Sequence, residues 1–309
     1  MSAVNIPTQI KSSYIGRFAP SPTGPLHFGS LVSALASYLD AHHNGGKWLV
    51  RMEDLDPPRE QAGAADAILR CLEDYGLEWD DSVLYQSQRW DIYEDYLTRL
   101  RQHDLLYACD CTRQDLQTMG GIYNGRCRTR YVDTSLPHAQ RLKLYDLPAG
   151  FSRQDELRFT DVIQGQQIQN LRSDAGDQIL KRKDGLYAYQ LAVVVDDIEQ
   201  GITHIIRGSD LLEVTARQIF LFQLLNAPVP VFGHVTLASQ PNGQKLSKQN
   251  LAPALELKDA GTNLWQALVF LRQNPPQELC SATPAELLDW GKVNWKRSNI
   301  CGLSAIYRN

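Results

Sequence analysis

Apolar runs and helical periodicities alternate along the first part of the chain. Residues 14–18 and 47–53 form short apolar runs typical of buried strands, and residues 31–41 between them carry alanine and leucine at helical spacing. The Gly45–Gly46 pair is typical of a helix end. A strand, a helix and a strand in this order predict a βαβ unit with parallel strands and a right-handed crossover.

The alternation of strands and helices continues in the next segments and then stops. Apolar positions at helical spacing predict helices over residues 61–75 and 88–102. Between residues 109 and 184, long periodic helices give way to short polar segments that contain several arginines. This change predicts an insertion.

The alternating and β-branched character returns after the insertion. Residues 186–195 and 202–207 predict two further strands. A helix over residues 214–225 and a strand near residues 231–237 follow. These elements predict the second half of one interrupted sheet.

The fold class predicted from this order is α/β, with a Rossmann-like, doubly wound parallel sheet. We expect the first half of the sheet in residues 1–108, the insertion in 109–185, the second half in 186–250 and a short helical region in 251–309. Ligands of such sheets bind at the carboxyl ends of the strands, where the two halves meet. Arg17, Glu53 and Arg207 lie at or near those predicted ends.

Composition excludes few classes of protein. Hydrophobic residues make up 43% and charged residues 21% of the chain, no apolar run is long enough to span a bilayer, and the start of the chain lacks the apolar core of a secretory signal. We therefore expect a cytoplasmic protein with no membrane partner. The net charge of −4 gives no global sign of a nucleic-acid binder.

Any contact with RNA phosphates therefore needs a local basic patch. Arg126, Arg128, Arg130 and the run 181–183 supply positive charge in or beside the insertion. Solvated faces are the alternative interpretation, because no aromatic residues are interleaved with these side chains.

Three of the six cysteines lie close together in sequence. Cys109, Cys111 and Cys127 suit a tetrahedral Zn²⁺ site, which needs a fourth ligand. No histidine lies between Cys111 and Cys127, and His103 and His138 are the nearest ones. In a large chain with no sign of secretion, this clustering favours a metal site over a disulfide framework, and free buried thiols are the alternative.

The segment 17–30 reads R-F-A-P-S-P-T-G-P-L-H-F-G-S, with three prolines and a glycine that prevent either regular structure from continuing. It predicts a strand, a stiff turn, and a helix whose first residues are His27, Phe28 and Gly29. A helix start presents unpaired N–H groups and can hold phosphate. His27 adds a side-chain donor, and Gly29 leaves room for a flat ring beside the backbone.

A second cationic motif, Lys245-Leu246-Ser247-Lys248, follows Gly243. Two lysines on such a loop can neutralise charge that develops on a triphosphate. A solvated face is the alternative for this lysine-rich loop taken by itself.

P-S-P-T-G-P-L-H-F-G resembles the "HIGH" motif of those class I aminoacyl-tRNA synthetases that activate glutamate. The lysine loop resembles their "KMSKS" motif, with Leu246 for Met and Gln249 for the last Ser. The resemblance covers residues 14–252 and implies the class I synthetase fold. It also implies ATP, with Mg²⁺, as a substrate, and catalytic roles for His27, Lys245 and Lys248. The ATP-binding residues that it implies are His27, Gly29, Lys245, Ser247 and Lys248.

The same resemblance implies a glutamate site. Arginine offers a planar fork to a carboxylate, a glutamate can take an ammonium and a tyrosine can lend a hydroxyl, although any one of them alone fits a surface ion pair or a core position. The positions that match the family's glutamate contacts are Arg17, Phe18, Ala19, Pro20, Ser21, Glu53, Tyr189 and Arg207.

The cysteine pattern C-x-C…Y-x-x-x-C resembles the zinc site of one subgroup, in which Tyr123 completes the shell around structural Zn²⁺. The segment after Lys248 is short, and we expect no anticodon-binding domain of about 100 residues in it. Together with the cysteine pattern and the H-F-G-S form, this makes the chain most similar to the glutamyl-queuosine tRNA(Asp) synthetases. That family activates L-glutamate without tRNA and transfers it to queuosine at the wobble position of tRNA(Asp). A truncated glutamyl-tRNA synthetase that charges a 3′ end and a catalytically silent paralogue that binds RNA or glutamate are the alternatives. We expect a monomer.

Overall fold

The computed structural model describes residues 14–151, 155–239, 253–302 and 304–306. Its first half begins with β1 (Ile15–Phe18), α1 (Phe28–His43) and β2 (Lys47–Met52), and β1 pairs with β2 in parallel. This arrangement confirms the predicted βαβ unit. The helix α1 begins at Phe28, one residue later than expected, because His27 is its N-cap. The first half continues through α2 (Ala64–Asp74), β3 (Leu84–Tyr85), α3 (Trp90–Gln102) and β4 (Leu106–Cys109).

The second half contributes two parallel strands beside β1. These are β9 (His204–Gly208) and β10 (Val231–Val235), connected by the helix α6 (Leu212–Leu224). The backbone N–H of Thr203 donates to Ile15 O at 2.9 Å, and β9 packs alongside β1. The strand order through the centre of the molecule is therefore β3-β2-β1-β9-β10, in which the two halves meet between β1 and β9.

Alternate side chains of these strands enter two different cores. Trp48 and Val50 of β2 pack with α1 on one face, whereas Leu49 packs on the opposite face with α3, α5 (Tyr189–Glu199) and α6. Both faces of a parallel sheet are covered in this way when helices wind over it in both directions. The doubly wound α/β class is thus confirmed.

The predicted strand at residues 186–195 is wrong, because this run lies mostly in the helix α5. Leu191, Ala192, Val193–Val195, Asp196 and Asp197 are all buried in it. A helix buried on every side lacks the polar face that produces a helical period in the sequence. Its packing outweighs the β-preference of three consecutive valines.

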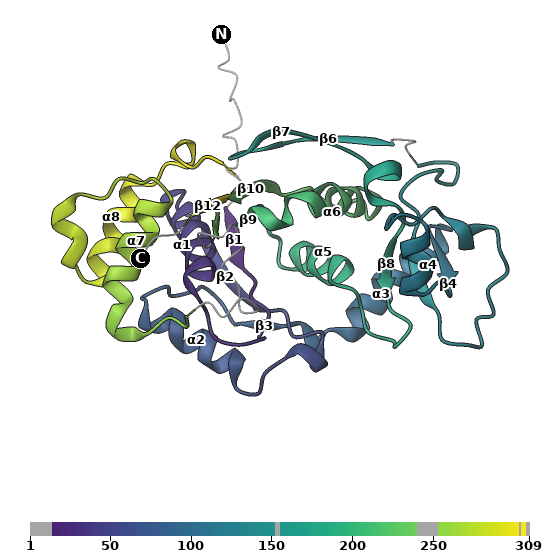
Figure 1. The fold of residues 1–309 in the computed structure, drawn as a ribbon, viewed down its shortest axis with the longest axis horizontal. Helices are drawn as coiled ribbons and strands as arrows, with labels where there is room; N and C mark the ends of the chain where they lie inside the picture. The colour runs from purple at the N-terminus through teal and green to yellow at the C-terminus, as the bar shows by residue number, and fades with distance from the viewer. Residues whose placement is uncertain (1–13, 152–154, 240–252, 303, 307–309) are drawn as a thin grey trace, which may run out of the picture.

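The described part of residues 109–185, which were predicted to form an insertion, consists of short elements. After β4 come α4 (Arg113–Thr118), β5 (Ala139–Leu142), the antiparallel hairpin of β6 (Glu156–Asp161) and β7 (Gly165–Asn170), and β8 (Gln178–Lys181). Figure 1 shows α4, β4 and β8 at one end of the molecule, while the hairpin runs back over α6 toward β10. A backbone hydrogen bond connects the hairpin to the second half of the sheet, because Val162 N donates to Phe232 O at 2.9 Å.

The C-terminal region is helical and covers α1. It contains α7 (Ala260–Phe270) and α8 (Pro284–Asn294), both at the opposite end of the molecule from α4, and its last strand, β12 (Ser304–Ile306), pairs with β11 (Leu237–Ser239) (Figure 1). Buried Asp40 of α1 anchors this region, because it accepts from Trp295 Nε1 at 2.8 Å and pairs with Arg297. Within the described residues, none of the helices is long and apolar enough to cross a membrane.

Candidate active site

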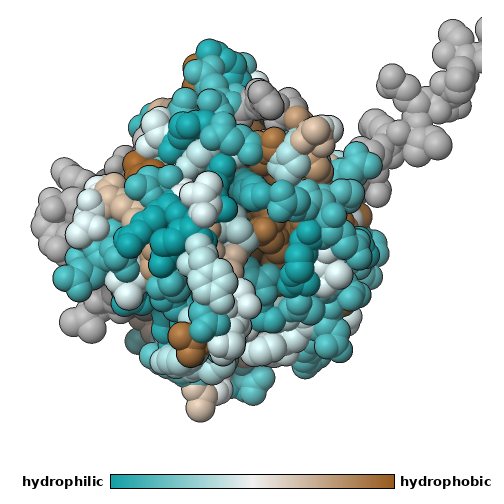
Figure 2. Space-filling model, turned by 90° about the vertical axis from the view of Figure 1, so that its right-hand side faces the viewer, coloured by the Kyte–Doolittle hydropathy of each residue, from teal (hydrophilic) through white to brown (hydrophobic). Residues whose placement is uncertain are grey.

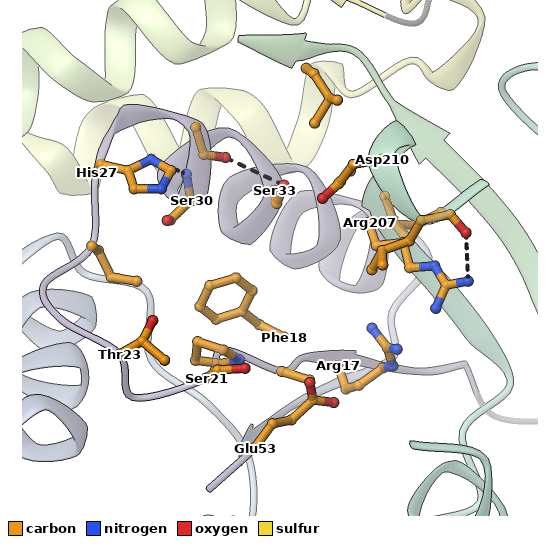
Figure 3. A pocket seen from close by; sticks show the side chains of 18 of the residues that line it. Arg17, Phe18, Ser21, Thr23, His27, Ser30, Ser33, Glu53, Arg207 and Asp210 are labelled. Atoms are coloured by element: carbon orange, nitrogen blue, oxygen red, sulfur yellow. Dashed lines mark hydrogen bonds between the residues drawn. The ribbon is translucent and has the colours of Figure 1, made fainter. Parts of the chain in front are cut away.

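A pocket of about 340 Å³ lies at the carboxyl ends of β1, β2 and β9, beside the start of α1. Figure 3 shows Arg17, Glu53 and Arg207 around one part of it and His27 at the other. The predicted residues that line it are Arg17, Phe18, Ala19, Pro20, Ser21, His27, Gly29, Glu53, Tyr189 and Arg207. The structure therefore brings together every predicted glutamate and ATP residue that it describes. Lys245, Ser247 and Lys248 lie outside the described residues.

Arg17 is held at the base of the pocket by a buried acid. Its Nε donates to Asp197 Oδ1 at 3.1 Å, and Arg51 donates to the same oxygen at 2.8 Å. Burial acts to raise the pKa of Asp197, but the two guanidinium groups hold it below its ordinary value. A charged Asp197 therefore orients Arg17 by charge-assisted hydrogen bonds.

Glu53 directly follows β2 and faces the same space. Burial raises the pKa of its carboxyl group to about 7, although Arg51 and Arg17 favour the charged form. Arg51 lies 3.5 Å away, a long contact that stabilises the carboxylate only in part. A positively charged group bound in the pocket would complete this compensation and shift Glu53 to its ionised form.

Arg207 is buried, with only 5% of its surface exposed. Its Nε donates to His234 Nε2 at 3.0 Å, and one terminal nitrogen donates to Thr215 Oγ1 and Gln218 Oε1 at 2.8 and 2.7 Å. All these acceptors are neutral groups or, for His234, a ring whose pKa burial lowers. The other terminal nitrogen, Nη1, is buried and has no hydrogen-bond partner among the described residues. Burial lowers the pKa of Arg207, and an anion would relieve that cost.

His27 is the N-cap of α1 and lies near the phosphate-binding end of that helix. Its Nδ1 accepts from Ser30 N at 3.2 Å, and this bond leaves the proton of a neutral ring on Nε2. The helix start and an imidazole N–H donor therefore lie on one wall of the pocket (Figure 3). Together they suit a phosphate group.

Tyr189 reaches the pocket from the start of α5 rather than from a strand. Burial, with Glu53 nearby, raises the pKa of its hydroxyl to about 12, so it stays neutral and can donate a hydrogen bond.

Several lining or supporting residues were not predicted. Asp197 could have been noticed as half of an acidic pair that ends an apolar run, and Asp210 as part of I-x-R-G-x-D-L. Thr23, Ser30 and Ser33 also line the pocket, without any distinctive spacing in the sequence.

A second cluster of side chains consists of Cys109, Cys111 and Cys127, the three cysteines among the predicted metal ligands. Their sulfur atoms all lie within 4.8 Å of one another and form no disulfide. The hydroxyl of Tyr123 lies 3.6 Å from Cys109 Sγ. His103 packs on Phe151, and no histidine of the described residues joins the cluster. Three such thiols are compatible with a Zn²⁺ site, and the Tyr123 hydroxyl beside them also accepts from Cys127 N at 2.8 Å.

Most of the basic side chains predicted near this cluster form ion pairs with other described residues. Arg128 pairs with buried Asp177 through two nitrogens, at 2.6 and 2.5 Å. The other members of the predicted basic group contact acidic residues, as follows: Arg126 with Asp115, Arg130 with Asp110, Lys181 with Glu94, Arg182 with Asp56 and Asp184, and Lys183 with the backbone oxygen of Asp110. The surface at this end of the molecule is mostly hydrophilic (Figure 2).

Comparison with known proteins assigns this chain to a family. Residues 15–271 match the family model of tRNA synthetases class I (E and Q), catalytic domain. A glutamyl-Q tRNA(Asp) synthetase of Ectopseudomonas mendocina is 50% identical over 291 residues, which cover 94% of this chain and 96% of that protein. One of Neisseria meningitidis is 51% identical over 296 residues, covering 93% and 97%.

A solved structure has the same fold. The glutamate-tRNA synthetase of Elizabethkingia anophelis superposes with a TM-score of 0.77 at 25% identity, over 96% of this chain and 68% of that protein. The family model and the relatives agree: the chain is a ligase of the class I tRNA synthetases for glutamate and glutamine and belongs, within them, to the glutamyl-Q tRNA(Asp) synthetase family.

Proposed function

We propose that the protein activates L-glutamate with ATP, without needing tRNA, and transfers it to queuosine at the wobble position of tRNA(Asp). The observation that carries the proposal is the buried Arg207, surrounded by neutral acceptors, in the pocket where Arg17, Glu53 and Tyr189 also lie. Such a guanidinium is suited to a substrate carboxylate. The names of the relatives support queuosine-bearing tRNA(Asp) as the acceptor.

In the first step, the α-carboxylate of glutamate attacks the α-phosphate of ATP in line. The bond between the α-phosphate and the bridging oxygen breaks, and glutamyl-adenylate and pyrophosphate form. Arg17 and Arg207 bind glutamate carboxylates, Glu53 its ammonium and Tyr189 a further oxygen. His27 and the start of α1 donate to phosphate oxygens, and we expect Lys245, Ser247 and Lys248 to do so too. ATP enters as its magnesium complex, in which the ion neutralises phosphate charge.

In the second step, a hydroxyl of the queuosine cyclopentenediol attacks the activated carbonyl, the bond from the carbonyl carbon to the phosphate oxygen breaks, and AMP leaves with the proton of the hydroxyl. Holding both reactants in register supplies much of the rate acceleration in such a step.

The test is a comparison of acceptors with radiolabelled glutamate. We expect pyrophosphate exchange with no RNA present, and charging of queuosine-containing tRNA(Asp) but not of queuosine-free tRNA(Asp) or of tRNA(Glu). Charging of tRNA(Glu) instead would identify a truncated glutamyl-tRNA synthetase. The absence of both exchange and charging would identify a non-catalytic binder.

The affinity for glutamate should depend on pH through Glu53. Because burial raises the pKa of Glu53 to about 7, part of the free enzyme carries a protonated, neutral Glu53 at neutral pH. Only the carboxylate attracts the substrate ammonium, so binding releases a proton and weakens as the pH falls. We expect Kd for glutamate to rise about tenfold per pH unit below that pKa and to level off above it.

Titration calorimetry over this range, with buffers of different ionisation enthalpy, measures both Kd and the released proton. Glu53→Gln should bind more weakly and without this pH dependence. A wild-type Kd that stays constant from acidic to alkaline pH would rule out the role of Glu53.

We also propose that Cys109, Cys111, Tyr123 and Cys127 hold a structural Zn²⁺. The supporting observation is the convergence of the three thiols, with the Tyr123 hydroxyl 3.6 Å from Cys109 Sγ, in a region with a small core of its own. Zinc bound there would cross-link β4, the segment after it and the turn at Cys127, and so stabilise the insertion without taking part in the reaction.

Cys127→Ser is expected to abolish zinc binding and to lower the thermal unfolding midpoint. Cys280→Ser, which changes an exposed cysteine outside the cluster, is the matched control and should retain the metal. Elemental analysis of protein purified without chelator should find about one zinc per chain. A wild-type preparation without zinc, or equal zinc in both variants, would contradict the assignment.

A further inference from the structure

Arg207 is the last member of a buried chain of hydrogen bonds that begins in the β6–β7 hairpin. Asp161, at the end of β6, contacts His234 of β10, and His234 contacts Arg207 of β9. The side chains of Asp161 and His234 are both 0% exposed. The chain therefore joins three segments that are far apart in the sequence and ends at the pocket.

The direction of each bond follows from the chemistry of its donor and acceptor. Arg207 has only donors, so its Nε–H donates to His234 Nε2 at 3.0 Å, and that nitrogen must carry a lone pair. The proton of the ring therefore lies on Nδ1, which is 2.6 Å from Asp161 Oδ2. Burial holds the pKa of His234 below its ordinary value, and the charged groups that face it are Asp161, Arg207 and Asp210.

Three backbone N–H groups fix the orientation of the Asp161 carboxylate. Ile163 N, Gln164 N and His234 N donate to Oδ1 at 3.0, 2.8 and 3.1 Å. Only Oδ2 is then directed at the ring. Neither Asp161 nor His234 lines the pocket, so any effect on the substrate passes through Arg207.

We propose that Asp161 and His234 are positioning residues for glutamate binding: Asp161 fixes the histidine tautomer that offers Nε2 as an acceptor, and this acceptor holds Arg207 with Nη1 available to a substrate carboxylate. This inference rests on the proposed function, because it assigns the role of Arg207 to glutamate. It explains why a guanidinium in this position is held by a neutral ring, since a carboxylate there would compete with the substrate for its charge.

Asp161→Asn separates this role from simple packing. The three backbone N–H groups need an acceptor at the position of Oδ1, so the amide oxygen of asparagine occupies that position and its NH₂ group faces His234 Nδ1. The ring must then accept at Nδ1 and carry its proton on Nε2, where it faces the Nε–H of Arg207 and can donate only to Thr215 Oγ1, 3.1 Å away. Loss of a hydrogen bond to a charged group predicts a rise in KM for glutamate of about 10- to 100-fold. KM for ATP should stay within about twofold, because the His27 end of the pocket is unaffected. Asp174→Asn, which changes an exposed acid just after the same hairpin, is the matched control and should change neither KM.

A double variant gives a readout that a merely structural role would not produce. The side-chain oxygen of glutamine can accept from Arg207 whatever residue 161 is, so Asp161→Asn combined with His234→Gln should recover KM for glutamate toward the wild-type value. If Asp161→Asn does not fold, His234→Gln and His234→Leu replace it, because only glutamine keeps an acceptor. KM for glutamate should then be at least about tenfold higher in the leucine variant.

Two outcomes would overturn the proposal: an Asp161→Asn enzyme with wild-type KM for glutamate, or a double variant no better than the single one. If the first variant does not fold, equal KM values in the glutamine and leucine variants would do the same. A wild-type enzyme without glutamate-dependent pyrophosphate exchange would instead show that the proposed function itself is wrong.

Discussion

Arg207→Ala is expected to lower kcat/KM for glutamate in pyrophosphate exchange by about 10²- to 10³-fold. The guanidinium is buried and its Nη1 has no partner among the described residues, so a substrate carboxylate gains a strong, desolvated ion pair there. Alanine removes that pair and leaves the carboxylate facing neutral groups. The loss should appear mainly in KM for glutamate, with KM for ATP little changed.

Two further variants make this result specific. Arg207→Lys keeps the charge but not the planar fork, and should recover only part of the activity. Arg158→Ala, which removes an arginine whose side chain is 64% exposed on β6, should behave as wild type. If Arg207→Ala retains wild-type kcat/KM while its thermal unfolding is unchanged, Arg207 does not bind the substrate.

Asp197→Ala should destabilise the protein more than any surface substitution. Asp197 and the two arginines it binds are at most 4% exposed, and its removal leaves two buried guanidinium groups without this carboxylate. Breaking a buried ion pair from one side costs about 3–5 kcal/mol of the free energy of unfolding. Because Asp197 also orients Arg17, any folded fraction should have a raised KM for glutamate.

Denaturant titration followed by circular dichroism measures the stability. Asp289→Ala removes an acid that is 78% exposed and paired with Lys292 on α8, and should change the free energy of unfolding by less than about 1 kcal/mol. Similar midpoints for the two variants would show that Arg17 and Arg51 do not depend on Asp197.

The hydrophobic pattern was sufficient to predict the parallel strands and therefore the place of the pocket. Arg17, Glu53 and Arg207 each lie within or next to the end of a predicted strand, and parallel strands bring such ends to one edge of the sheet. His27 was identifiable because the prolines before it leave a helix start as the next regular structure.

The pattern failed where an element is buried on every side. The run that became α5 has no polar face, so its period could not distinguish a helix from a strand, and only packing against α3 and α6 decided the outcome. The basic residues near the cysteines show the same limit. Some of their acidic partners lie far away in the chain: Asp177 is 49 positions from Arg128, and Asp56 is 126 positions from Arg182.

By itself, the sequence determined that parallel strands would bring Arg17, Glu53 and Arg207 to one edge of the sheet, and its resemblance to a family implied the ligand roles that we propose for them. The tertiary structure alone decided how those side chains are held. Asp197 reaches Arg17 across 180 positions, and Asp161 reaches His234 across 73. Local spacing reflects periodic burial and turn geometry, which act between near neighbours, whereas pairing of buried charges depends on which distant segments share an interior.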